Sequence, residues 1–180
     1  EDTAGSTAHV EMLSKQKIIS FKIKNKIIYG LDKIKKEIFK NKFNFNKKYE
    51  DIHMNIEKRL FQIIGEEAGY IHTARSRNDQ VITDFKMWTK SATNEINKNL
   101  NKLIKTILRI SEKNIETIMP GFTHLKNAQA VSFAHYLMAY VEMFIRDKKR
   151  FLNNLENLSE CPLGVAALTG TSFNIDRNLT

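Results

Sequence analysis

The chain has 180 residues, 42% of them hydrophobic, and a formal net charge of +9. Such a length and apolar content allow one domain with a buried core, or one domain and part of a second. The single cysteine, Cys161, excludes a disulfide framework and a thiolate zinc cluster, and no apolar run approaches the roughly 18 residues of a membrane span.

Lysines are densest between Lys22 and Lys48, where they alternate with Ile, Phe and Tyr. A basic stretch of this kind is found in nucleic-acid binders, but also on solvated helix faces. Lys, Asn and Ile are enriched together in this chain, so we favour the solvated helix and expect no nucleic-acid partner. A true nucleic-acid binder would lose affinity steeply as salt is added.

The first third of the chain predicts short helices. Residues 9–19 and 31–39 have helical patterns on either side of a Lys- and Asn-rich connection. Residues 51–64 give a clearer helix, because Ile52, Ile56, Leu60 and Ile63 recur at steps of three and four and Gly65 follows. Residues 69–77 are predicted to form a loop.

Two long helices are predicted in the remainder. The first spans about residues 78–113, which corresponds to roughly 50 Å of helix, and its apolar stripe is wider than a surface helix requires. The second spans about residues 127–155. Such lengths predict an all-α bundle, completed by other subunits or by further sequence. We therefore expect an N-terminal helical domain over residues 1–76 and the first part of a bundle domain over residues 77–180.

A dense polar segment, residues 72–80, lies just before the first long helix and reads His-Thr-Ala-Arg-Ser-Arg-Asn-Asp-Gln. Ser76 and Asp79 fit a helix capping box, yet capping does not require Arg75, Arg77 or Asn78. A helix N-terminus offers free N–H groups, and Arg adds paired donors that match a carboxylate. The segment therefore predicts a site for a polycarboxylate.

A second polar segment, residues 120–126, reads Pro-Gly-Phe-Thr-His-Leu-Lys and is expected to open the second long helix. Pro120 and Gly121 form a turn, Thr123 adds a hydroxyl, and His124 adds an imidazole that titrates near neutral pH. No set of His, Asp and Glu has the spacing of metal ligands, so we expect no metal.

These segments resemble two signatures of the argininosuccinate lyase family, within the fumarase/aspartase superfamily. Residues 73–80 match the first signature throughout, and residues 120–130 match the second with two departures, Lys126 for Gln and Ala130 for Pro. Shorter matches occur at residues 50–53, 162–164, 167–168, 170–171 and 175–177, in the family's order.

The resemblance implies elimination of arginine from argininosuccinate with release of fumarate, in arginine biosynthesis, without a cofactor. It implies that Thr123 and His124 are catalytic, with Thr123 also binding substrate. We expect Ser76, Arg77 and Asn78 to bind substrate as well, together with Lys126 and His53. It further implies a homotetramer whose active sites each combine signatures from three subunits, and the cytoplasm as the compartment.

The family's third signature, a mobile loop rich in glycine and serine, is absent from these 180 residues. We therefore expect a fragment of the N-terminal half, inactive by itself. Which group is the base and which the acid stays open, because the family divides the two proton transfers between that loop's serine and the Thr-His pair. Three alternatives also stay open: another fumarate-releasing lyase of the superfamily, a non-catalytic helical member, and a basic helical nucleic-acid binder.

Overall fold

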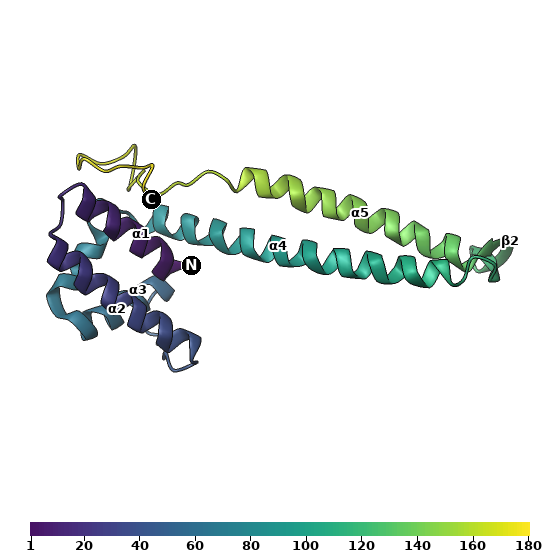
Figure 1. Ribbon diagram of the computed structural model, residues 1–180, viewed down its shortest axis with the longest axis horizontal. Coiled ribbons are helices and arrows are strands. Elements are labelled where there is room, and N and C mark those ends of the chain that lie inside the picture. The colour runs from purple at the N-terminus through teal and green to yellow at the C-terminus, as the bar shows by residue number, and fades with distance from the viewer. The chain divides into compact units, whose positions relative to one another are not determined.

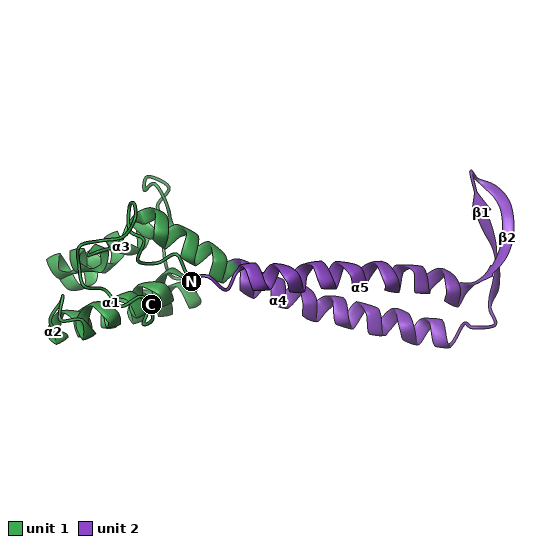
Figure 2. Cartoon of the chain, turned by 90° about the horizontal axis from the view of Figure 1, so that it is seen from above, with its two compact units in different colours: residues 1–88, 161–180 green, residues 89–160 purple.

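The computed structural model describes residues 1–180 and is predominantly helical, as predicted (Figure 1). Its contacts divide it into two compact units, residues 1–88 with 161–180 and residues 89–160 (Figure 2). The predicted domain boundary between residues 76 and 77 stays a prediction. The elements, in chain order, are α1 (Asp2–Lys15), α2 (Phe21–Phe39), α3 (Ile52–Ile64), the 3-10 helix η1 (Gly65–His72), α4 (Arg77–Glu112), β1 (Ile118–Thr123), β2 (Lys126–Ser132) and α5 (Phe133–Asn157).

The first unit has a hydrophobic core formed by α1, α2, α3 and η1. Apolar residues at helical spacing supply it, because they place one face of each helix against its neighbours. The fully buried members are Val10, Leu13, Ile27, Leu31, Ile34, Ile56 and Leu60. Gly30 allows the close approach of α2 to α3, since a Cβ there would overlap the Leu60 side chain. This core fixes the helices on which several predicted site residues lie.

Local caps explain where these helices begin and end. Ser20 Oγ accepts a hydrogen bond from Ile23 N, so α2 begins at Phe21, ten residues before the predicted start. Asp51 Oδ1 accepts from Met54 N at 2.6 Å, and Gly65, at φ 81°, ends α3 as predicted. The prediction for α1 was wrong at its start, which lies at Asp2 rather than His9. Residues 69–72 belong to η1 and not to a loop.

The second unit contains most of α4, the strands and α5. The predicted long helix is confirmed as α4, with 36 residues. Helix α5 returns alongside the part of α4 that belongs to this unit, and the two views agree on this (Figures 1 and 2). No helix of the structure has both the length and the apolar content to cross a membrane.

The segment before α5 is a β-hairpin, so the prediction that residues 120–126 open a helix from about residue 127 was wrong. Pro120 and Gly121, predicted to form a turn, lie within β1. The strands β1 and β2 pair antiparallel, with Thr123 opposite Lys126, and His124 and Leu125 form the two-residue turn at φ 49° and 63°. Left-handed conformation at both turn positions matches the twist of a tight hairpin. The register shifts between Pro120 and Phe122, and a Cβ at Gly121 would lie 2.6 Å from Gln129 O. Strand pairing thus overrides the helix propensity of residues 126–130.

Candidate active site

The Ser76–Asp79 pair forms the predicted capping box at the start of α4. Ser76 N donates to Asp79 Oδ1 at 3.0 Å, and Asn78 N donates to Ser76 Oγ at 3.2 Å. These bonds satisfy N–H groups that have no partner within the helix. The hydroxyl of Ser76 is therefore engaged in fixing the helix start, beside any contact with substrate.

Asp79 has a second role that the sequence did not reveal. Its other oxygen, Oδ2, accepts hydrogen bonds from Gly164 N at 3.2 Å and Ala166 N at 2.8 Å. Asp79 is only 3% exposed. One buried carboxylate therefore ties the first turn of α4 to a chain segment 85 to 87 residues away. Pro162-Leu163-Gly164 had been noted only as a match to the family, and nothing in its pattern predicted this partner.

The Arg77 guanidinium is already paired with carboxylates. Nη1 and Nη2 donate to the two oxygens of Glu57, both at 3.0 Å, and Nε lies 3.4 Å from Asp51 Oδ2. Nη1 also donates to Gln80 Oε1 at 2.8 Å. Burial would lower the pKa of Arg77, but the hydrogen bonds that it donates to Glu57 and the charges of Glu57, Asp51 and Asp2 outweigh this effect and raise that pKa. To bind a substrate carboxylate in the predicted way, Arg77 would have to share or release Glu57.

Asn78 and Arg75, which lie in the same polar segment, differ in their exposure to solvent. Asn78 is exposed and its side-chain amide has no partner in the chain, so it is available to a ligand. Arg75 is buried, with Nη1 donating to Ser6 Oγ at 2.9 Å and with Nε and Nη2 unpaired. Burial lowers the pKa of Arg75. The structure thus places Arg75 inside the first unit and Asn78 at its surface.

His53 lies in a buried cluster of three ionisable side chains from three helices. Its Nδ1 is 2.6 Å from Asp2 Oδ2, on α1, and 3.4 Å from Asp84 Oδ2, on α4. Burial would lower the pKa of His53, but the hydrogen bond and charge of Asp2 and the charges of Asp84 and Asp51 outweigh it and raise that pKa. Burial, reinforced by Asp2, raises the pKa of Asp84 to about 6.

Gln80 joins this cluster to Arg77. Its Nε2 donates to Asp2 Oδ2 at 2.7 Å, while its Oε1 accepts from Arg77 Nη1. The side chains of Arg77, Gln80 and Asp84 share a face of α4, since they lie three and four residues apart. That spacing was visible in the sequence and could have indicated Gln80 and Asp84. The contribution of Asp2 carried no such signal, because it depends on how α1 packs.

The distances in this cluster fit a hydrogen bond better than a metal site. One potential ligand atom from each of Asp2, His53 and Asp84 lies within 4.8 Å of the other two, and such a trio can bind a divalent cation in other proteins. Ligands at about 2.0–2.1 Å from a tetrahedral ion are separated from each other by about 3.3 Å. The 2.6 Å between His53 and Asp2 is too short for that and suits a charge-assisted hydrogen bond.

Thr123, His124 and Lys126 lie at the tip of the hairpin, in the second unit. All three are exposed, and their side chains make no hydrogen bond or ion pair within the chain. Leu125, between them, is 98% exposed. A two-stranded hairpin has little stability of its own in water. The predicted acid/base residue, His124, therefore lies at a hairpin tip where no other side chain of this chain holds it.

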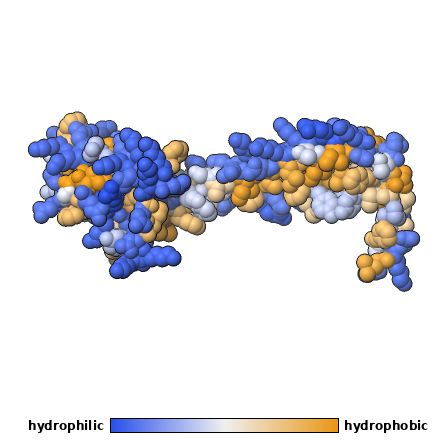
Figure 3. Space-filling model, turned by 90° about the horizontal axis from the view of Figure 1, so that it is seen from below, coloured by the Kyte–Doolittle hydropathy of each residue, from blue (hydrophilic) through white to orange (hydrophobic).

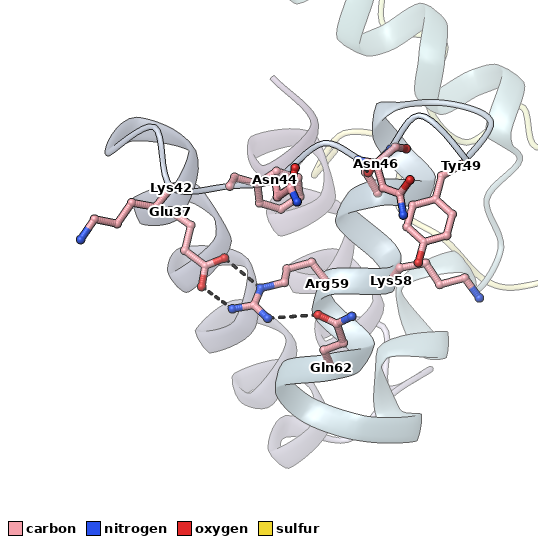
Figure 4. Close-up of a pocket in the computed structure, with 10 residues that line it drawn as sticks. Glu37, Lys42, Asn44, Asn46, Tyr49, Lys58, Arg59 and Gln62 are labelled. Atoms are coloured by element: carbon pink, nitrogen blue, oxygen red, sulfur yellow. Dashed lines mark hydrogen bonds and ion pairs between the residues drawn. The ribbon is translucent and has the colours of Figure 1, made fainter.

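Of two cavities in the first unit, one contains predicted site residues and the other does not. One, of about 500 Å³, has largely apolar walls and includes the buried cluster of Asp2, His53 and Asp84. The other, of about 420 Å³, lies among α2, α3 and the loop between them, and contains none of the predicted site residues. Figure 4 shows that Arg59 in this second cavity is held by Glu37 and Gln62. We therefore associate only the first cavity with the site.

Comparison with known proteins supplies the family. A family model described as a lyase matches residues 1–180. The argininosuccinate lyase of Pelagibacter ubique (strain HTCC1062) is 86% identical over 180 residues, which are 100% of this chain and 39% of that protein. The argininosuccinate lyase of Bartonella bacilliformis is 51% identical over 180 residues, again 100% of this chain and 39% of that protein. The chain thus spans about two fifths of the length of these relatives.

Solved structures show the same fold. EDDS lyase in complex with formate superposes with a TM-score of 0.85 at 26% identity, over 99% of this chain and 35% of that one. A fumarate lyase:delta crystallin from Brucella melitensis, bound to cobalt, gives a TM-score of 0.81 over 99% of this chain and 42% of that one. Its 17% identity supports the fold alone.

Proposed function

Since the chain belongs to the lyase family that its whole length matches, we propose that it is part of an argininosuccinate lyase, which reversibly eliminates arginine from argininosuccinate and leaves fumarate. The observation that carries the proposal is the 86% identity to a curated argininosuccinate lyase across all 180 residues. The proposed enzyme is a cytoplasmic homotetramer that serves arginine biosynthesis, as the resemblance implies, and it uses no metal.

The chemistry requires removal of a weakly acidic proton next to a carboxylate and protonation of the leaving guanidine nitrogen. Fixed donors lower the barrier when they face the carboxylate on which negative charge develops. In the proposal Asn78, Thr123 and Lys126 supply such donors, and His124 exchanges a proton with the substrate. Asn78 and the three hairpin residues are the predicted site residues whose side chains are free to do so.

The surface of the second unit supports the tetramer. Ile96, Leu103 and Ile110 are each about 40% exposed on α4 and lie seven residues apart. Apolar residues repeated at seven positions form the seam of packed helical bundles. On α5, Ile145 and Leu152 repeat the same spacing and are both 45% exposed. Figure 3 shows apolar side chains gathered along this unit. We propose that helices of other subunits cover these residues.

The test of the proposed activity uses the full-length enzyme that contains this sequence. It should release fumarate from argininosuccinate, followed by ultraviolet absorbance, and do so faster than from aspartate or malate. His124→Ala should lower kcat by about 100-fold or more, the usual weight of a general acid or base. His124 is exposed, so folding should be unaffected. Preference for aspartate or malate would favour a sister lyase, and unchanged turnover in the variant would remove the role given to His124.

A further inference from the structure

The cluster around His53 has features that packing does not explain. Its three side chains come from α1, α3 and α4, which are distant in sequence, and all three are buried. Asp84 Oδ2 accepts no hydrogen bond, and its near neighbour is the His53 ring at 3.4 Å. Buried carboxylates that stabilise a fold are normally hydrogen-bonded. Asp84 therefore costs the first unit stability unless nearby positive charge compensates it, and His53 has the largest such effect.

The other side of the His53 ring is free. Nδ1 is taken by Asp2 and Asp84, whereas Nε2 makes no hydrogen bond within the chain. His53 also lines the cavity of about 500 Å³ described above, whose remaining wall is largely apolar. A cation beside a largely apolar wall attracts an anionic group more strongly than one surrounded by water on all sides. The free nitrogen is thus placed to donate a hydrogen bond to an anion.

We propose that Asp84, together with Asp2, is a positioning residue that keeps His53 in its doubly protonated form, so that Nε2–H binds a carboxylate of the substrate. The inference rests on the proposed function for the identity of that substrate. Asp84 itself touches no substrate and acts through His53.

The charges around the ring agree with this assignment. The charged groups that act on His53 are Asp2 from α1, Asp51 at the cap of its own helix and Asp84 from α4, and all are acidic. The buried guanidinium of Arg75 acts in turn on Asp2 and Asp84. Their combined effect raises the pKa of His53, and burial with Asp2 raises that of Asp84 to about 6. The acidic neighbours therefore favour the doubly protonated imidazole, in which Nδ1–H is donated to Asp2.

The experiment follows His53 directly in the full-length enzyme. Histidine is labelled with ¹³C, and the His53 signal is assigned by its loss in His53→Gln. In the unchanged enzyme His53 should titrate above pH 6.5, its ordinary value. Asp84→Asn, which keeps the shape of the side chain, should lower that pKa and raise KM for argininosuccinate about tenfold, with kcat altered less than twofold. Asp32→Asn, an exposed change of the same charge, should alter neither quantity.

Stability separates positioning from a structural role. If Asp84 acts only through His53, Asp84→Asn should not lower the thermal midpoint at a pH above the measured His53 pKa, where the ring is neutral and the variant only removes a buried charge. A lower midpoint with an unchanged His53 pKa would make Asp84 structural and overturn the inference. A His53 pKa at or below 6.5 in the unchanged enzyme would overturn it without any variant. Stoichiometric binding of Zn²⁺ that shifts the His53 signal would also overturn it, since the cluster would then be a metal site.

These outcomes are distinct from failure of the proposed function. An enzyme that cleaves argininosuccinate but shows no effect of Asp84→Asn on the His53 pKa or on KM refutes the positioning role alone. An enzyme that lacks the activity refutes the proposed function. In that case the His53 titration alone still tests whether Asp84 keeps His53 doubly protonated.

Discussion

The carboxylate of Asp79 provides the sharpest test of the fold around the site. It accepts three backbone hydrogen bonds, from Ser76, Gly164 and Ala166, at 3.0, 3.2 and 2.8 Å. Asp79→Asn keeps the size of the side chain but replaces one acceptor oxygen by an amide that can only donate. In the better of its two orientations, the amide retains the bonds to Gly164 and Ala166 and leaves Ser76 N without its partner.

The expected cost follows from these bonds. An N–H group left without its partner costs about 1–3 kcal/mol, and two bonds that change from charged to neutral acceptors each weaken by about 1 kcal/mol. Loss of a negative charge at the first turn of α4 adds about 0.3–1 kcal/mol. The first turn of α4 should therefore be destabilised by about 1–4 kcal/mol, whereas the anchor between α4 and the segment at Gly164 should weaken by about 2 kcal/mol. This second change corresponds to a population of the opened segment that is about 30-fold larger.

Hydrogen exchange read by mass spectrometry on the full-length protein measures this change. Peptides that contain Gly164 and Ala166 should exchange about 30-fold faster in Asp79→Asn than in the unchanged protein, because local opening limits their exchange. The hairpin peptide over residues 118–132 should not change, and exposed Asp32→Asn serves as the matched control. Less than threefold acceleration at Gly164 and Ala166 would refute the anchoring role of Asp79.

Three further predictions concern other parts of the chain. Burial lowers the pKa of His9 to about 4 from its ordinary 6.5, so the folded state binds fewer protons than the unfolded state between these values and stability is lost as pH falls from 6.5 to 4. In His9→Gln that loss, about 3 kcal/mol, should largely disappear from urea unfolding curves. Gly121→Ala should disrupt the hairpin, because its Cβ would lie 2.6 Å from Gln129 O; faster exchange over residues 118–132 would register this, and unaltered exchange would contradict it. Leu103→Glu should shift the full-length protein towards smaller species in sedimentation velocity, and an unchanged distribution would show that this residue faces no other subunit.

The sequence determined the features that depend on local spacing. The apolar residues of α3 recur at helical steps and Gly65 follows them, so that helix was predicted within one residue. The long run of helical spacing after Asn78 likewise predicted α4. The capping box of Ser76 and Asp79 was also visible, because its partners are three residues apart. Local hydrogen bonds and amphipathic faces require only neighbours in the chain.

The tertiary structure alone decided the features that join distant residues. Most of residues 126–130 are good helix formers, yet pairing with β1 makes them a strand and places His124 at a hairpin tip. The chain of contacts from Arg77 through Gln80 and Asp2 to His53 depends on how α1, α3 and α4 pack. The spacing of residues along the sequence does not reveal which side chains contact each other across three helices, because the packing of the shared core sets those contacts.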